Sequence, residues 1–138
     1  MPEDRRLAHT TRIQIRWGDM DAAGHVNNTI YFRYMEQARV EWLEELRLKA
    51  GPNAPFAVVV NASCTFLIPF THPGVVDVRF FADRPGRSSL QTYYELRLID
   101  DERICAEGSA KMVFVDSRTG KSIVIPDNLR RLIDPSQE

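Results

Sequence analysis

This sequence of 138 residues lacks long apolar runs, and it lacks the usual sequence features of a membrane-bound or secreted protein. No apolar run approaches the roughly 18 residues that a membrane-spanning helix needs, so we expect no membrane partner. The first ten residues are charged and lack the apolar centre of a signal peptide. Only two cysteines are present, Cys64 and Cys105, and they lack C-x-x-C spacing. We therefore expect reduced thiols and a cytoplasmic protein.

An excess of charge of either sign is also missing. The chain has 18 Lys and Arg residues against 19 Asp and Glu residues, which gives a net charge of −1. This balance gives no reason to expect a nucleic-acid partner. The motifs G-x-S-x-G, G-x-x-x-x-G-K-[ST], G-x-G-x-x-G and H-E-x-x-H are all absent. The three histidines show no metal-ligand spacing with the cysteines, so we expect no metal cofactor.

One long helix is the clearest element that the sequence does contain. It starts near Asn27 and Asn28, which both suit a helix N-cap, and Gly51 followed by Pro52 ends it. Apolar residues recur at helical spacing and form a wide stripe that must be covered, namely Ile30 or Tyr31, Tyr34, Met35, Ala38, Trp42, Leu43 and Leu46. The spacing of Glu36 and Arg39 on this helix predicts an ion pair between them.

Alternating patterns predict five strands. The first covers about residues 7–17, with Trp17 on the apolar side, and the second is a run from Phe56 to Phe70 in which every even position is apolar. We expect one face of that run to lie in the core. Strands at 75–82, 88–99 and 103–115 follow, and residues 126–133 read as a short helix. Short connections between consecutive strands predict an antiparallel sheet. The expected fold is a single α+β domain over residues 1–138, a curved sheet around one helix known as a hotdog.

The second face of this sheet is too apolar to be fully hydrated. The odd positions that would occupy it include Val59, Leu67, Phe81, Ile99, Val113 and Val115. Such a face favours a partner copy, so we expect at least a homodimer. A dimer of dimers remains an open alternative.

The segment just before the long helix is the candidate site. Two acids, Asp19 and Asp21, stand there with Gly24 and His25. The first turn of a helix offers free N–H groups and partial positive charge, which can hold an oxyanion. A carboxylate nearby is available as a base or nucleophile, and together they suit attack on a thioester carbonyl. The competing interpretation is that these residues only form a turn and a cap, and for Asp19 we favour that role.

The same residues carry a family resemblance. The stretch RWGDMDAAGHVNNTIYFRYMEQARVEWL resembles the N-terminal signature of the 4-hydroxybenzoyl-CoA thioesterase family, hotdog proteins in which D-x-D-x-x-G precedes the long helix. RPGRSSLQTYYEL is similar to the central hairpin of that family, and the resemblance spans about residues 10–116. It implies an acyl-CoA thioesterase that needs no cofactor and places its active sites between two subunits.

The resemblance also implies roles for individual residues. Asp21 would be the catalytic carboxylate, and the backbone N–H of Asn28 would polarise the thioester carbonyl, with Asn27 and His25 beside them. The family carries an aromatic residue or a histidine where this chain has Asn28. The substrate-binding residues that we expect, including those of a turn that would contact CoA, are Gly24, Arg84, Arg87, Ser88 and Ser89.

Two other functions fit the same residues. A hotdog hydratase or dehydratase would use Asp21 and His25 to move protons on an enoyl thioester. A module that binds acyl-CoA without turnover would keep the fold and lose the chemistry. Release of free thiol separates hydrolysis from both alternatives.

Overall fold

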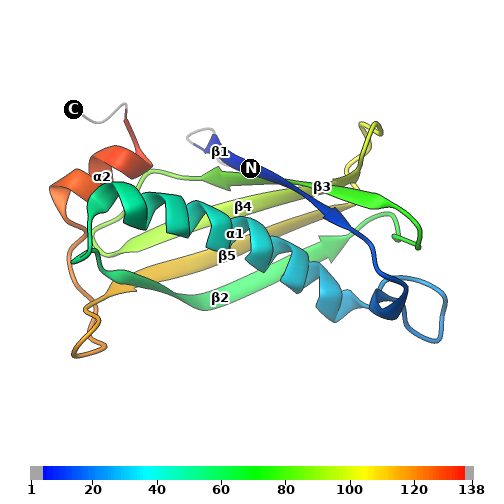
Figure 1. The fold of residues 1–138 in the computed structure, drawn as a ribbon, viewed down its shortest axis with the longest axis horizontal. Helices are drawn as coiled ribbons and strands as arrows, with labels where there is room; N and C mark the ends of the chain where they lie inside the picture. The colour runs from blue at the N-terminus through cyan, green and yellow to red at the C-terminus, as the bar shows by residue number, and fades with distance from the viewer. Residues whose placement is uncertain (1–4, 136–138) are drawn as a thin grey trace.

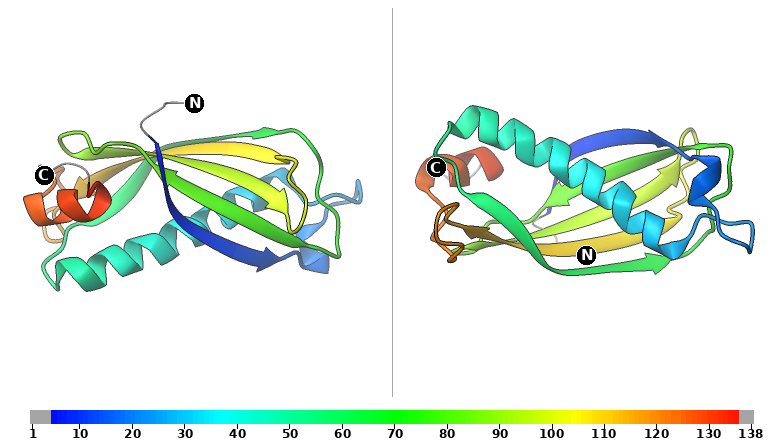
Figure 2. Two further views of the ribbon diagram at one scale, coloured as in Figure 1. Left: turned by 90° about the horizontal axis from the view of Figure 1, so that it is seen from above. Right: turned by 60° about the horizontal axis from the view of Figure 1, so that its bottom comes forward.

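The computed structural model describes residues 5–135 and shows one antiparallel sheet of five strands. The strands lie in the order β1-β3-β4-β5-β2, so β1 and β2 form the two edges (Figure 1). Their bounds are Arg6–Gln14 for β1, Phe56–Phe66 for β2, Val75–Ala82 for β3, Ser89–Leu98 for β4 and Ala106–Val115 for β5. The expected α+β hotdog fold is confirmed, because this sheet curves around one long helix (Figure 2).

The long helix α1 runs from Asn28 to Ala50 and begins and ends as its caps predict. Asn27 is the N-cap, and its side-chain oxygen accepts a hydrogen bond from the backbone N–H of Thr29 at 2.9 Å. Gly51 follows the last turn with φ of +101°, a conformation that glycine adopts easily. The buried face consists of Tyr31, Tyr34, Met35, Ala38, Trp42 and Leu46, which matches the predicted stripe.

The concave face of the sheet supplies the other half of the core. Even-numbered side chains of β3, β4 and β5 alternate inward and are almost fully buried, among them Val76, Val78, Phe80, Leu90, Tyr94, Leu96, Met112 and Phe114. Gly108 lies beneath the helix, and a Cβ atom there would collide with the side chain of Met35. The small residues of β5 at this point therefore allow α1 to approach the sheet closely. The short helix α2, Asp127–Ile133, closes one end of the core with Leu129 and Ile133 (Figure 1).

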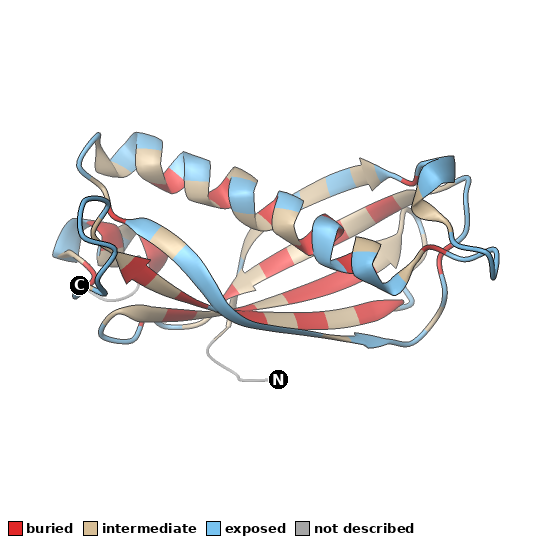
Figure 3. Ribbon diagram, turned by 90° about the horizontal axis from the view of Figure 1, so that it is seen from below, coloured by how far each residue is buried: buried red, intermediate tan, exposed pale blue. Residues whose placement is uncertain are grey.

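Strand β2 differs from the expectation in both length and burial. It ends at Phe66 instead of Phe70, and the register shifts between Val59 and Asn61, which breaks the alternation. The even positions that we expected in the core are largely exposed, and Phe56, Val58, Val60 and Phe66 expose 41–56% of their surface. Most of the β2 ribbon is accordingly coloured as exposed in Figure 3. The physical reason is that β2 is an edge strand: among the described residues it pairs with β5 alone, and α1 covers it lightly.

Three smaller expectations were also wrong. Strand β1 ends at Gln14, and Trp17 opens a 3-10 turn, η1 (Trp17–Asp19), where it is 75% exposed. The last strand begins at Ala106 instead of residue 103. On α1, Glu36 accepts from Arg33 at 3.3 Å, while Arg39 donates to the hydroxyl of Tyr94 at 3.2 Å, so the predicted pair of Glu36 with Arg39 is replaced by two separate contacts. The sequence spacing could not show that Tyr94 lies beneath Arg39.

Candidate active site

The turn that leads into α1 is held by Asp19. One carboxylate oxygen of Asp19 accepts hydrogen bonds from the backbone N–H of Arg16 and from the hydroxyl of Tyr34, both at 2.9 Å. Burial, reinforced by the Asp19 carboxylate, raises the pKa of Tyr34 well above its ordinary value, so the hydroxyl remains a donor. Asp19 therefore acts as the turn anchor that we favoured for it. Sequence reasoning had assigned Tyr34 only to the core.

Asp21 lies in a small closed loop directly in front of the helix. Its backbone N–H donates to the carbonyl of His25 at 2.9 Å, and Gly24 returns a hydrogen bond to the carbonyl of Asp21 at 3.0 Å. Gly24 has φ of +81°, which explains the glycine at this position. The loop is closed by the bridge between Met20 and Val26. This arrangement fixes the backbone of Asp21 while its side chain stays exposed.

The Asp21 carboxylate is linked to the start of α1. One oxygen accepts from the backbone N–H of Ala23 at 2.9 Å, and the other lies 3.4 Å from the side-chain nitrogen of Asn27, the N-cap. The cap side chain also binds the N–H and hydroxyl of Thr29. Among residues 5–135, no acceptor is seen for the N–H of Asn28, the first residue of the helix. A carboxylate and a free helix N–H thus lie on adjoining parts of one exposed surface.

A cavity begins at the same helix end. It has a volume of about 260 Å³ and lies between the first three turns of α1 and strand β2, with Thr29, Phe32, Met35, Arg39 and Ala62 among its lining residues. Its wall on the sheet side comes from Ala62 of β2, an edge strand. A larger hollow of about 670 Å³ lies on the β1 side of the same helix end, with Asp19, Ile30 and Tyr34 among its lining residues.

The other expected binding residues lie far from Asp21 in the same chain. Arg84, Arg87 and Ser88 lie in the turn between β3 and β4, and Ser89 begins β4. This turn lies next to α2, at the opposite end of the sheet from η1 (Figure 1). The carbonyl of Arg87 accepts from the N–H of Ile125, and the guanidinium of Arg130 donates to the carbonyls of Pro85 and Gly86. One chain alone therefore does not bring this turn to Asp21, and its contact with substrate remains a prediction that requires a second copy.

Metal and membrane features can be checked for the described part of the chain. Residues 5–135 contain no group of three or more His, Cys, Asp and Glu side chains arranged to hold a metal ion. Neither helix in that range combines the length with the apolar character that a membrane crossing demands. Both cysteines are free thiols.

Comparison with known proteins identifies the family. A family model described as the thioesterase-like superfamily matches residues 15–133, which includes the loop, α1 and all strands after β1. The chain belongs to the thioesterase-like superfamily. It is a thioester hydrolase by family, as the residues around Asp21 predicted.

Related structures and curated proteins agree with this family. The PA2801 protein from Pseudomonas aeruginosa, provisionally described as a thioesterase, is 42% identical, with a TM-score of 0.83 and coverage of 93% of this chain and 99% of its own. A Thermus thermophilus thioesterase in complex with coenzyme A and zinc is 26% identical, with a TM-score of 0.80 and coverage of 94% and 99%. The long-chain acyl-CoA thioesterase FadM of Escherichia coli is 24% identical over 127 residues, covering 90% of this chain and 96% of FadM.

The hydrogen bond from Tyr34 to Asp19 yields a first testable prediction. Replacing Tyr34 with Phe removes the donor and leaves the ring, so we expect a loss of about 1–3 kcal/mol in the free energy of unfolding. The loop before α1 should also loosen, which should lower kcat. Urea unfolding and a thioesterase assay measure the two effects. Tyr93→Phe is the control, because the Tyr93 hydroxyl has no hydrogen bond to residues 5–135. Equal behaviour of the two variants would contradict the anchoring role.

Proposed function

We propose that this thioesterase hydrolyses acyl-CoA with Asp21 as its catalytic carboxylate and the N–H of Asn28 as its oxyanion donor. The observation that carries the proposal is the 3.4 Å approach of the Asp21 carboxylate to Asn27, the cap of α1, beside a helix N–H without an acceptor. The relatives that bind coenzyme A or hydrolyse long-chain acyl-CoA support the substrate class.

The geometry permits two routes to the same products. As a base, Asp21 takes a proton from water while the water oxygen attacks the thioester carbonyl. As a nucleophile, Asp21 forms an anhydride and releases the CoA thiolate, and water then cleaves the anhydride. In both routes negative charge develops on the carbonyl oxygen, where one backbone donor contributes about 3 kcal/mol. The carbonyl of His25 accepts from the N–H of Asp21, and the side chain of Asn27 approaches the Asp21 carboxylate, so we propose that they position Asp21 and contact the substrate.

Release of free thiol from a panel of acyl-CoA esters tests the activity. The panel should contain short, medium and long acyl chains and aromatic acyl groups, each also presented on acyl carrier protein. We expect thiol release from at least one CoA ester. Hydration of an enoyl-CoA without thiol release would favour the hydratase alternative, and binding without turnover would favour the binding module. Either result would refute the proposal that this chain hydrolyses acyl-CoA.

We also propose that two copies pair through the edge of β2. The outer face of the sheet is partly covered within the chain, since Arg5 lies over the ring of Phe81 and pairs with Glu95. The exposed apolar side chains instead gather on β2 and the adjoining face of α1: Phe32, Val40, Phe56, Val58, Val59, Val60 and Phe66. An unpaired strand edge with this composition favours association with another chain.

A two-fold axis beside β2 would have a consequence for the site. If the two β2 edges pair antiparallel, the axis is perpendicular to the strands and reverses the direction of β2 and α1, so the helix N-terminus of one copy lies at the same end of the dimer as the β3–β4 turn of the other. This arrangement would explain why Asp21 and the turn with Arg84 and Arg87 occupy opposite ends of one chain. It supports CoA binding across two subunits. A cytoplasmic location is part of the same proposal, supported by the two free thiols.

Replacement of Val58 with Lys tests this dimer. A charge in the middle of the edge should prevent burial of the strand, so we expect a monomer by size-exclusion chromatography with light scattering, together with reduced activity. Val124→Lys is the matched control, because Val124 is similarly exposed, at 52%, but lies outside β2. A dimer that survives Val58→Lys would place the interface elsewhere.

A further inference from the structure

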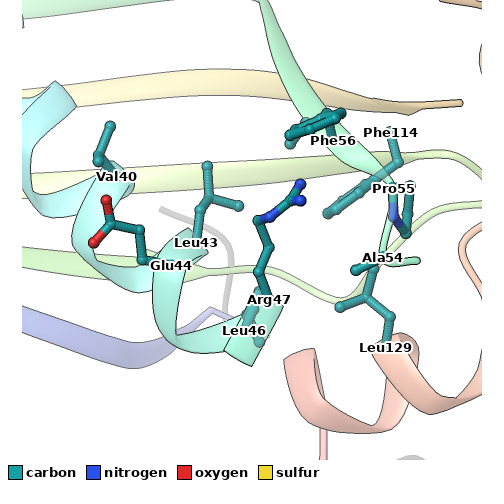
Figure 4. Close-up of a pocket in the computed structure, with 11 residues that line it drawn as sticks. Val40, Leu43, Glu44, Leu46, Arg47, Ala54, Pro55, Phe56, Phe114 and Leu129 are labelled. Carbon is teal, nitrogen blue, oxygen red and sulfur yellow. The ribbon is translucent and has the colours of Figure 1, made fainter. Parts of the chain in front are cut away.

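Helix α2 packs on the core next to the turn between β3 and β4. Its side chains Leu129 and Ile133 are only 2% and 1% exposed. Leu129 lies with Ala54 and Phe114 around a small apolar cavity of about 170 Å³ (Figure 4). A helix of seven residues gains its stability from such packing more than from its own hydrogen bonds. The apolar contacts therefore fix how α2 presents its polar side chains to the turn.

Arg130 follows Leu129 on α2, and its guanidinium is hydrogen-bonded to the turn. Nη1 donates to the carbonyl of Pro85 at 3.1 Å, and Nη2 donates to the carbonyls of Gly86 at 2.9 Å and Arg87 at 3.4 Å. The planar guanidinium presents several donors in a fixed arrangement, so this one side chain can bind three successive carbonyls at once. The conformation of three consecutive peptide units thus depends on Arg130.

These hydrogen bonds give the turn two different sides. Pro85 is buried, whereas Arg84 and Arg87 are exposed. The carbonyl of Arg87 also accepts from the backbone N–H of Ile125 at 2.9 Å, just before α2. Carbonyl oxygens carry partial negative charge and would repel a phosphate group that they faced. Because Arg130 and Ile125 bind these oxygens, the exposed side of the turn is left to the two arginine side chains.

We propose that Arg130 is a positioning residue for CoA binding. It holds the turn so that Arg84 and Arg87 reach the phosphate groups of CoA, and it makes no contact with CoA itself. A turn that is already ordered loses less conformational freedom when it binds a ligand, which strengthens the binding. This inference rests on the proposed function, in which the turn of one copy binds the CoA of an ester held at Asp21 of the other copy.

The decisive variant is Arg130→Met, which keeps an apolar stem and removes every donor to the turn. We expect its affinity for CoA, measured by calorimetry on the full chain, to fall about tenfold, because the phosphate contacts then start from a mobile turn. Arg131→Met is the matched control, since Arg131 is the next residue on α2 and is exposed. It removes the same charge and should leave the affinity for CoA unchanged. Thermal unfolding verifies that both variants fold.

Steady-state kinetics should show the same effect in KM alone. With a CoA ester that the wild type hydrolyses, Arg130→Met should raise KM about tenfold and keep kcat within about twofold, because Asp21 lies at the opposite end of the sheet. The matching acyl-pantetheine has the same thioester but lacks the nucleotide and its phosphate groups. Its kcat/KM should be equal for Arg130→Met and the wild type, whereas a general loss of structure would lower it.

A double-mutant cycle shows whether Arg130 acts through the turn. Replacing Arg84 and Arg87 together with Met should weaken CoA binding at least as much as Arg130→Met does. Adding Arg130→Met to that variant should then have no further effect, because no phosphate contact is left to position. A further loss of affinity would mean that Arg130 binds a phosphate group directly, and it would overturn the positioning role.

The outcomes also separate this inference from the proposed function. Unchanged CoA affinity in folded Arg130→Met would overturn the inference even if the wild type releases thiol from acyl-CoA. An equal loss in Arg131→Met, or a wild type that does not bind CoA, would overturn it as well. A wild type that binds CoA in this Arg130-dependent way and releases no thiol would refute hydrolysis and support the positioning role.

Discussion

Replacement of Asp21 with Asn is expected to lower kcat by at least about 10²-fold, the smaller end of what a general base contributes, and further if Asp21 is the nucleophile. The amide has nearly the shape of the carboxylate, and the contact of Oδ1 with the N–H of Ala23 can be kept. What disappears is the negative charge that attacks the carbonyl or accepts the proton of water. Because the substrate contacts elsewhere remain, KM should change little. Steady-state thiol release measures both constants.

Asp100→Asn is the control for this experiment. Asp100 is exposed and has φ of +62°, a conformation that Asn also tolerates, and it lies in the turn between β4 and β5. The kcat of the Asp100→Asn variant should equal that of the wild type. If a folded Asp21→Asn protein kept normal kcat, the carboxylate mechanism would be excluded. A single turnover in ¹⁸O-labelled water then separates the two routes, since label in the Asp21 side chain indicates an anhydride.

Replacement of Phe80 with Ala is expected to reduce the free energy of unfolding by about 3–5 kcal/mol. Phe80 is fully buried on β3 and packs between Trp42 of α1 and Tyr94 of β4, with ring centroids 4.8 and 5.3 Å away. Truncation leaves a void between helix and sheet that neither ring can fill by a small movement. Urea unfolding followed by far-ultraviolet circular dichroism measures the loss.

The neighbouring Phe81 provides a control with the same chemistry on the other face. Its ring is half-buried and is covered by the guanidinium of Arg5 at 4.0 Å from the ring centroid. Phe81→Ala should therefore cost only about 1 kcal/mol, which combines partial burial with an exposed cation–π contact. Similar losses for the two variants would mean that the even-numbered face is not the principal core.

The helix, the strand pattern and the loop were predictable because each depends on local chemistry. Asn27, Gly51 and the apolar stripe of α1 specify where the helix starts, where it ends and which side is buried. The position of β2 was not predictable in the same way. Alternation at Phe56, Val58 and Val60 shows that one face of the strand is apolar. It does not show whether that face packs on the core of its own chain or on a second chain, because both would remove it from water.

Some features of the candidate site could likewise be predicted from the sequence, and others could not. The D-x-D-x-x-G pattern before a helix predicts Asp21 and Asn28 as site residues; the structure shows the Asp21 loop beside the helix cap, and the catalytic roles of both residues stay predictions. The hydrogen bond of Tyr34 to Asp19 and the contact of Arg39 with Tyr94 were missed, because they join residues whose proximity depends on how α1 lies on the sheet.

The sequence by itself determined the α+β class, the single long helix and the acidic loop that precedes it, since caps, turns and periodicity act over a few residues. Only the tertiary structure decided that β2 is an exposed edge, that Arg84 and Arg87 lie at the opposite end of the sheet from Asp21, and that Tyr34 donates to Asp19. These features depend on which distant segments share a surface, and that is set by packing of the whole chain.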